Sequence, residues 1–250
     1  MLRRFAGLNC PEIASLLMHP DPNHDSPLAF STAERDVLYR VMRARRDVRR
    51  FLPQPVPADV LGRILEMAHY APSVGFMQPW NFILVSSPEL RRQIKTLFDA
   101  VNTRQHGQVE AADRRDLYAS LKLEGILEAP LNLVVTCDHR RDAPFVLGRG
   151  PMPETDLYST CLAIQNIWLA ARAEGVGVGW VSILDRTATE QLLGLPEGVQ
   201  LVAYLCLGYP IEFADKPMLE TVGWKSRLAL EELVFDDRWG RPSTLFSHQT

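Results

Sequence analysis

Arg45-Arg46-Asp47-Val48-Arg49-Arg50-Phe51 is the most informative stretch of the chain, and a proline-bounded loop at residues 71–82 (APSVGFMQPWNF) follows one helix later. The first stretch places a single carboxylate among four guanidinium groups. Arginine presents planar, permanently charged donors that suit a phosphate. The small residues of the loop let backbone N–H groups approach a flat polar ring. Together they predict a site for a phosphate-bearing heteroaromatic molecule.

Composition limits the other roles that the arginines could have. The chain has 250 residues, 46% of them hydrophobic, and a formal net charge of −3. This length and apolar content favour one large domain with a full core. A weakly acidic chain offers no general attraction to nucleic acid or to an anionic membrane. The arginine run is also short and contains Asp47, so a local anion site is the better interpretation.

Cysteine use and hydropathy indicate a soluble protein of a reducing cytoplasm. Cys10, Cys137, Cys161 and Cys206 show no Cys-x-x-Cys spacing, and three of them lie in apolar stretches where a packed, reduced thiol is the common state. Residues 1–18 are interrupted by polar residues and form no signal-peptide core. No stretch approaches the ~18 consecutive apolar residues that a membrane-spanning helix needs.

The first three helices are predicted by capping signals and apolar spacing. Ser31 and Glu34 form a capping box, and the helix that they start ends at the arginine cluster. A second helix follows Pro57 and ends before Pro72. A third is capped by Ser87.

Further along the chain, apolar residues at helical spacing from Leu157 to Ala171, including Cys161 and Trp168, predict a long helix that ends near Gly175. Thr187 and Glu190 are expected to cap a short helix. Continuous apolar runs predict strands at residues 82–85, 131–137, 178–183 and 199–207. Strands that alternate with helices indicate a layered domain of α and β elements.

Three regions are expected along the chain. Residues 1–30 form an N-terminal arm that is rich in helix breakers, residues 31–210 form the domain, and residues 211–250 form a C-terminal arm with too little apolar content for its own core. Residues 101–117 are polar and predict an exposed helix or a mobile cover, which makes them our candidate lid.

Both informative segments resemble the flavin-binding nitroreductase superfamily, which carries an Arg-x-Ser-x-Arg-like strand and a Pro-Ser…Gln-Pro-Trp loop. Asp47 stands where ordinary nitroreductases usually have Ser, and residues 177–183 (GVGWVSI) replace their acidic segment facing the flavin. At both positions the sequence resembles the 5,6-dimethylbenzimidazole synthase family. The resemblance extends from Thr32 to Gly208, with a weaker echo at residues 225–227.

This resemblance implies an α+β, nitroreductase-like three-layer sandwich with a mixed sheet covered by helices. It also implies a homodimer that exchanges its C-terminal arms and holds the flavin at the dimer interface. The implied reaction is the O2-dependent fragmentation of reduced FMN to 5,6-dimethylbenzimidazole, the lower ligand of cobalamin, with release of erythrose 4-phosphate. FMN is then a substrate, O2 is the co-substrate, a separate flavin reductase supplies reduced FMN, and no metal takes part.

The resemblance also assigns roles to residues. Asp47 becomes the acid/base, and Ser182 orients the flavin-peroxide near the ring nitrogen. Nearby arginines lower the pKa of Asp47 and desolvation raises it, so its protonation state is left open. The expected FMN-binding residues are Arg45, Arg46, Asp47, Val48, Arg49, Ser73, Gln78, Ser182, Lys225 and Arg227.

Alternative interpretations exist for each feature. The arginines suit a helix C-terminus and Asp47 suits charge neutralisation, although an exposed ion pair contributes only ~0–1 kcal/mol. Ser182 is equally compatible with a buried, self-satisfied hydroxyl. The six histidines show no His-Glu-x-x-His pattern and no pairing with cysteine, which disfavours a metal site. Two other functions fit the same residues, namely an FMN-retaining NAD(P)H-dependent nitro- or quinone reductase and a non-enzymatic flavin-binding protein.

Overall fold

The computed structural model describes residues 28–142 and 144–246. The chain divides into two compact units, with the boundary between Arg40 and Val41. Most of the predicted N-terminal arm, with Cys10, lies outside the described residues. Helix α2 (Thr32–Ala44) begins in the first unit and ends in the second. Its capping box is confirmed, because Ser31 N–H donates to Glu34 Oε2 (2.9 Å) and Glu34 N–H donates to Ser31 Oγ (3.4 Å).

The second unit is built on a four-stranded sheet in its described part. The strands are β1 (Trp80–Val85), β2 (Leu131–Asp138), β3 (Gly177–Val181) and β4 (Val199–Gly208), in the order β1-β2-β4-β3. All three neighbouring pairs are antiparallel, and a single parallel bridge joins Asp47 to Val178 beside β3. All four predicted strands are confirmed.

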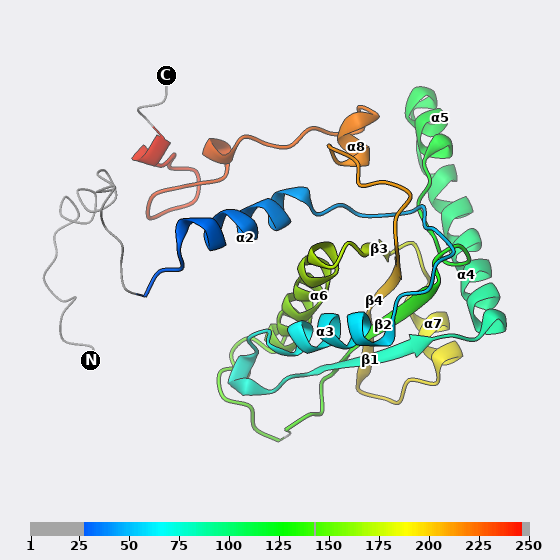
Figure 1. The fold of residues 1–250 in the computed structure, drawn as a ribbon, viewed down its shortest axis with the longest axis horizontal. Coiled ribbons are helices and arrows are strands. Elements are labelled where there is room, and N and C mark those ends of the chain that lie inside the picture. Colours follow the sequence, from blue (N-terminus) through cyan, green and yellow to red (C-terminus); the bar gives the residue numbers. More distant parts are fainter. Residues whose placement is uncertain (1–27, 143, 247–250) are drawn as a thin grey trace, which may run out of the picture. The chain divides into compact units, whose positions relative to one another are not determined.

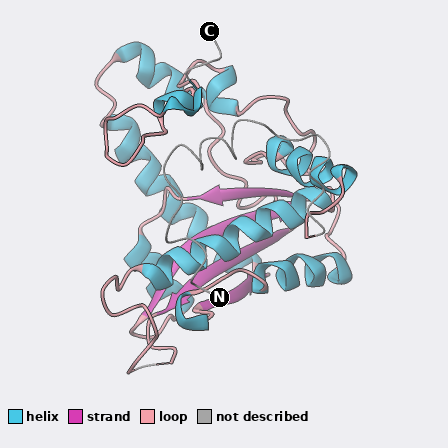
Figure 2. Cartoon of the chain, turned by 90° about the vertical axis from the view of Figure 1, so that its left-hand side faces the viewer, coloured by secondary structure: helices cyan, strands magenta, loops and turns pink. Residues whose placement is uncertain are grey.

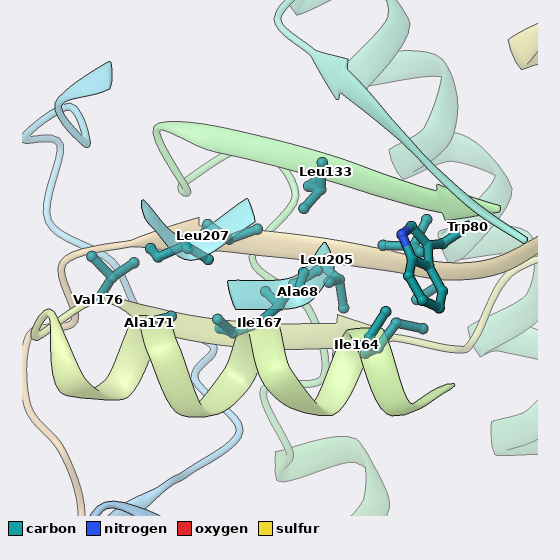
Figure 3. Close-up of a cluster of buried hydrophobic side chains, with 14 of the residues drawn as sticks. Ala68, Trp80, Leu133, Ile164, Ile167, Ala171, Val176, Leu205 and Leu207 are labelled. Atoms are coloured by element: carbon teal, nitrogen blue, oxygen red, sulfur yellow. The ribbon is translucent and has the colours of Figure 1, made fainter. Parts of the chain in front are cut away.

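One face of the sheet is covered by α3 (Ala58–His69) and α6 (Thr155–Ala173), which lie next to each other (Figure 1). Alternate residues of a strand point to opposite faces, so Leu133 and Leu205 turn toward these helices. Figure 3 shows Ile164 and Ile167 of α6 in this cluster with Leu205. Each fully buried side chain of this size stabilises the fold by about 1.5–3 kcal/mol.

The opposite face packs against α4 (Pro88–Gly107) and α7 (Arg186–Leu193). Val134 and Tyr204, which alternate with the residues of the first cluster, contact Ile94 and Phe98 of α4. Figure 2 shows the strands with the helices packed along them. The predicted three-layer α+β sandwich is therefore confirmed.

Most of the polar segment at residues 101–117 is helical. It comprises the last turns of α4, from residue 101 to Gly107, and most of α5 (Ala112–Ser120), which has no buried residue. Tyr118 OH joins the two helices by donating to Asn102 Oδ1 (2.7 Å). The predicted exposed helix is confirmed, while its motion as a lid stays a prediction.

Two local predictions are wrong. The short helix α7 is capped by Asp185 rather than Thr187, because Ala188 N–H donates to Asp185 Oδ1 (3.0 Å). Glu190, expected in the capping box, instead accepts from Leu201 N–H (2.8 Å). On α6 the buried stripe contains Thr160, so Cys161 is exposed instead of packed. Cys137 and Cys206 are buried as predicted.

The chain after Pro210 forms little regular structure. It contains α8 (Met218–Thr221) and the short 3-10 helices η2 (Leu230–Glu232) and η3 (Thr244–Phe246). None of its described residues is buried, in keeping with the predicted absence of a separate core. Among the described residues, no helix has the length and hydropathy needed to cross a bilayer.

Candidate functional site

Asp47 is placed at the edge of the sheet by the backbone on either side of it. The chain leaves α2 at Ala44 and runs beside β3, where Val48 N–H donates to Val178 O (2.9 Å). Val48 anchors the segment because its side chain is buried in the core. Its backbone and side chain therefore present the neighbouring Asp47 at the surface.

The Asp47 carboxylate is held by two groups. Trp180 N–H donates to Oδ1 (2.9 Å), and the Arg49 guanidinium donates to Oδ1 (2.9 Å) and forms an ion pair with Oδ2. The Asp47 side chain still has 42% of its surface exposed, whereas that of Arg49 has 14%. One side of the carboxylate is therefore fixed by protein, and the other is open to a ligand.

The surroundings of Asp47 raise its pKa above the ordinary value for aspartate. Desolvation by the protein around the carboxylate is the largest cause. Arg49, the Trp180 N–H group and Arg45 oppose this shift by stabilising the charged form. The net direction suits a group that takes up and releases protons nearer to neutral pH than a free aspartate does.

Arg45 lies beside Asp47 with its guanidinium stacked on an aromatic ring. Its Cζ atom lies 4.9 Å from the centre of the Trp168 ring, and Trp168 Nε1–H donates to Val178 O (3.0 Å). Desolvation lowers the pKa of Arg45, Asp47 opposes that shift, and Arg46 and Arg227 lower the pKa further. Arg227, from the C-terminal arm, therefore adds a second positive charge near Arg45.

Arg46 has a different environment. Its guanidinium donates to the carbonyl oxygens of Arg43 and Arg45 (2.7 Å each) and to that of Asp215. These bonds connect the end of α2 to the chain that follows β4. Arg46 is thus engaged mainly with backbone in the structure.

Ser182 and Lys225 belong to the same predicted set as Asp47. Ser182 is exposed directly after β3, on the same face of the strand as Trp180, two residues away. Lys225 is exposed on the C-terminal arm two residues before Arg227. The alternative of a buried Ser182 hydroxyl is excluded by this exposure.

The predicted loop carries Ser73 and Gln78 in a constrained conformation. Ser73 Oγ accepts a hydrogen bond from Gln78 N–H (3.0 Å), closing the loop around the 3-10 helix η1 (Val74–Phe76). Phe76 and Gln78 have φ angles of 57° and 50°, a region that side-chain-bearing residues rarely adopt. Each such residue costs on the order of 1–3 kcal/mol, so surrounding contacts must hold the loop.

Two side chains outside the predicted set supply those contacts. Arg141 donates to the carbonyl oxygens of Gln78 and Trp80 (3.0 Å to the latter) and to Asn81 Oδ1. Ser159, near the start of α6, accepts from Val74 N–H (3.1 Å). Sequence reasoning missed both, because they lie about 60 and 85 residues away from the groups that they bind.

The predicted residues thus form two groups. Asp47, Arg45 and Arg49 lie near Trp168 and Trp180, whereas Ser73 and Gln78 lie near Ser159. Trp168 and Ser159 are nine residues apart on α6, which corresponds to roughly 13 Å along the helix axis. Among the described residues, no hydrogen bond or ion pair joins the two groups directly.

A hollow of about 380 Å³ lies beside the loop. Its walls are formed by the loop, by α3 and β1 on either side of the loop, and by the segment after β2. The lining residues are His69, Phe76, Met77, Gln78, Trp80, Phe82, Arg141 and Asp142. His69 Nδ1 accepts from Trp80 Nε1–H (3.2 Å), so one wall is fixed by a hydrogen bond.

One group of described side chains has the spacing of metal ligands, namely Cys137, His139 and Asp156. Asp156 Oδ2 is already bound by His139 Nδ1 (2.9 Å) and paired with Arg149 (3.1 Å). Burial raises the pKa of Cys137 to about 11, which favours the thiol over the thiolate that a metal requires. The cluster is better explained as a buried ion-pair network at the start of α6.

Comparison with known proteins places this geometry in context. Residues 42–209 match the model of the nitroreductase family. The chain is 44% identical over 198 residues to a 5,6-dimethylbenzimidazole synthase of Rhodospirillum rubrum, covering 79% of this chain and 93% of that protein. It is 43% identical over 202 residues to a 5,6-dimethylbenzimidazole synthase of Rhodobacter capsulatus, covering 81% and 97%.

A solved structure supports the same placement. Oxidized iodotyrosine deiodinase bound to FMN and 3-iodo-L-tyrosine superimposes with a TM-score of 0.61 and 26% identity, covering 71% of this chain and 91% of that chain.

Proposed function

The chain belongs to the nitroreductase family and, within it, to the 5,6-dimethylbenzimidazole synthases, and we propose that it fragments reduced FMN with O2 to 5,6-dimethylbenzimidazole and erythrose 4-phosphate. The observation that carries this proposal is the Asp47 carboxylate. It is fixed on one side by Arg49 and Trp180 and open on the other, beside a stacked arginine.

The residues near Asp47 fit the phosphate of FMN. Arg227 is close enough to Arg45 to disfavour the positive charge of Arg45, and the Arg45 side chain has no hydrogen-bond acceptor among the described residues. A phosphate group between them would relieve this repulsion and accept bidentate hydrogen bonds. Lys225 lies on the same arm and adds a third positive charge.

The second group of residues supports a flavin site shared by two subunits. The Ser73–Gln78 loop lies toward the other end of α6 from Asp47, and it exposes Phe76 (79% accessible). Leu147 (73%) is also exposed, and its backbone lies beside Gly75, the residue before Phe76. Neighbouring exposed apolar side chains mark an interaction surface. We assign this loop to the interface of a homodimer, where Ser73 and Gln78 hold polar atoms of the flavin ring.

Reduced FMN, when bound, would provide the group that reacts with O2, because dihydroflavins react with O2 without a metal. The contribution of the chain is proton transfer and positioning. Asp47 accepts and returns a proton at Oδ2, the carboxylate oxygen that is bound by Arg49 alone, and the Ser182 hydroxyl donates or accepts a hydrogen bond two residues beyond Trp180. We propose that α5 and the end of α4 keep water from the site during the reaction.

Replacing Asp47 by Asn tests the proposal. The variant is expected to retain most of the affinity for reduced FMN, because Arg45 and Arg227 remain, and to lose at least 100-fold in product formation, the usual contribution of general acid–base catalysis. Reduced FMN is titrated into each protein without O2, air is admitted, and 5,6-dimethylbenzimidazole is quantified by chromatography. Wild-type turnover by Asp47→Asn would remove Asp47 from the mechanism. An absence of product from the wild-type protein would contradict the proposed function.

A further inference from the structure

We propose that Arg49 is the positioning residue of Asp47 and is not a ligand of the FMN phosphate: its guanidinium fixes the direction of the carboxylate and favours its ionised form. This inference rests on the proposed function, in which Asp47 transfers protons. It separates the role of Arg49 from that of Arg45, four residues earlier in the same run.

Arg49 has no exposed donor left for a phosphate, because its terminal N–H groups face protein acceptors and its Nε–H group is buried. A guanidinium group has five N–H donors, two on each terminal nitrogen and one on Nε. Nη1 faces Asp47 Oδ1 (2.9 Å) and, more distantly, Val48 O (3.5 Å). Nη2 faces Asp47 Oδ2 and Trp180 O (2.8 Å), and Nε is buried without a partner. All four terminal N–H groups therefore point to acceptors of the protein itself.

Trp180 makes this arrangement a closed ring of hydrogen bonds. Its N–H group donates to Asp47 Oδ1, and its C=O group accepts from Arg49 Nη2. The backbone of β3 thus sets the positions of both side chains at once. A carboxylate held in this way has one orientation rather than several, which is what a proton-transfer group needs.

Gly179 leaves the space that the Val48 carbonyl group and the Arg49 guanidinium occupy. A Cβ atom at this position would lie 2.6 Å from Arg49 Nη1 and would collide with the carbonyl oxygen of Val48. A side chain there would displace either Arg49 or the strand-like backbone that carries Asp47. Glycine at residue 179 is therefore part of the same arrangement.

Arg45 provides the contrast. Its guanidinium stacks on Trp168 and has Arg227 nearby, and no acceptor of the described protein binds it. Of these two arginines, Arg45 is the one available to an external anion.

Arg49 also acts on the charge of Asp47. The charged groups that act on this carboxylate are Arg49 and, more weakly, Arg45, and both lower its pKa against the desolvation that raises it. Removing the positive charge of Arg49 leaves desolvation less opposed, so the pKa of Asp47 rises. The ionised form is then reached only at higher pH, and the acidic limb of the activity profile moves in the same direction.

The test compares Arg49→Gln and Arg49→Lys with Arg45→Gln in the full-length protein. Dissociation constants for oxidised FMN and for riboflavin, which lacks the phosphate, are measured by flavin fluorescence. Arg45→Gln should lose about tenfold or more of the preference for FMN over riboflavin, as expected for a hydrogen bond to a charged group worth about 1.5–3 kcal/mol. Arg49→Gln should keep the wild-type preference, even if both flavins bind more weakly.

A second measurement follows Asp47 directly. The carboxyl carbons of aspartate are labelled with ¹³C and titrated by NMR in the flavin-free protein, and Asp47→Asn identifies the signal. The signal should titrate at higher pH in Arg49→Gln than in wild type. Arg49→Lys keeps the positive charge but lacks the two parallel donors of a guanidinium, so its signal should titrate close to that of wild type. The pH profile of product formation should move the same way.

Two results would overturn the inference. One is a loss of FMN preference in Arg49→Gln as large as that in Arg45→Gln, which would make Arg49 a phosphate ligand. The other is an Asp47 titration that does not change in either Arg49 variant. Neither measurement requires turnover, so failure of the proposed reaction would be seen separately, as missing product from the wild-type protein. If Arg49→Gln does not fold, Arg49→Lys still gives the ratio for FMN and riboflavin.

Discussion

Three arginines within five positions of the chain have different roles. Arg45 stacks on Trp168, Arg46 binds backbone carbonyl groups, and Arg49 binds Asp47. These differences follow from the segment's path, because it leaves a helix and then runs beside β3. Composition alone treats the three as equivalent donors.

The site near Asp47 was largely predictable at this scale. Side chains alternate along extended backbone, so Arg45, Asp47 and Arg49 belong on one face of the segment after α2, and the bonds between Asp47 and Arg49 are consistent with that. Arg141 was not predictable. Its segment reads as an irregular loop, and its partners are fixed only by the pairing of β1 with β2.

Arg141 provides a prediction for the loop that carries Ser73 and Gln78. Arg141→Ala removes the donors that hold the carbonyl groups of Gln78 and Trp80, so the loop with positive φ angles should open. We expect a loss of about 1–3 kcal/mol in the free energy of unfolding, together with weaker flavin binding. Thermal unfolding, hydrogen exchange at residues 73–81 and flavin titration measure these effects.

Arg140→Ala is the matched control for Arg141→Ala. Arg140 is the preceding residue, but it is exposed and pairs with Asp138 rather than with the loop. It should leave hydrogen exchange at residues 73–81 unchanged. Equal exchange in the two variants would show that Arg141 does not hold the loop.

Helices and strands were mostly predictable because their apolar patterns match one buried face each. The strands of the sheet and the helices α2, α3, α4 and α6 occur where the patterns placed them. The predicted start of α7 was wrong because Asp185 and Thr187 are both good capping residues. Glu190 does not complete the capping box because it accepts a hydrogen bond from Leu201 N–H, 11 residues further along the chain. The shift of the α6 stripe from Cys161 to Thr160 also depends on packing against the sheet.

The C-terminal arm is the element that we propose to bind a second subunit. It exposes Leu228 (51%), Leu230 (58%), Leu233 (55%) and Trp239 (91%). Its first residues belong to the rest of the domain, since Phe213 lies over the Arg172 guanidinium (3.9 Å) and Asp215 O binds Arg46. Trp224 and Arg227 also lie near the domain, whereas the hydrogen bonds of the described residues from Ala229 onward stay within the arm, so this last part is expected to cover a partner.

Deleting the arm after Lys216 tests this expectation, because the truncation keeps Phe213 and Asp215. Full-length protein should sediment as a dimer, and residues 1–216 should dissociate to monomer or dimerise much more weakly, since the apolar arm residues are lost. Flavin affinity should fall as well, because Lys225 and Arg227 are removed. A truncated protein that remains a dimer and binds flavin as tightly as the full chain would contradict the exchanged-arm arrangement.

At the scale of the whole molecule, the candidate lid and the C-terminal arm are in contact. Arg114 of α5 lies over the Trp224 ring (4.7 Å) and donates to Trp224 O (2.8 Å), one residue before Lys225. If the arm binds the phosphate as proposed, we expect the position of α5 to change with it. This contact was not predictable from sequence, because the arm has no periodic pattern that would reveal its neighbours.

The central claim is that flavin is consumed as a substrate, and the stoichiometry of aerobic turnover tests it most directly. Total flavin, O2 and 5,6-dimethylbenzimidazole are followed while a reducing system regenerates reduced FMN, with Asp47→Asn as the control without turnover. The account predicts that benzimidazole accumulates in proportion to FMN lost and O2 consumed, and that each turnover needs fresh reduced FMN. Sustained oxidation of NAD(P)H with undiminished FMN and no benzimidazole would contradict it and would identify an FMN-retaining reductase instead.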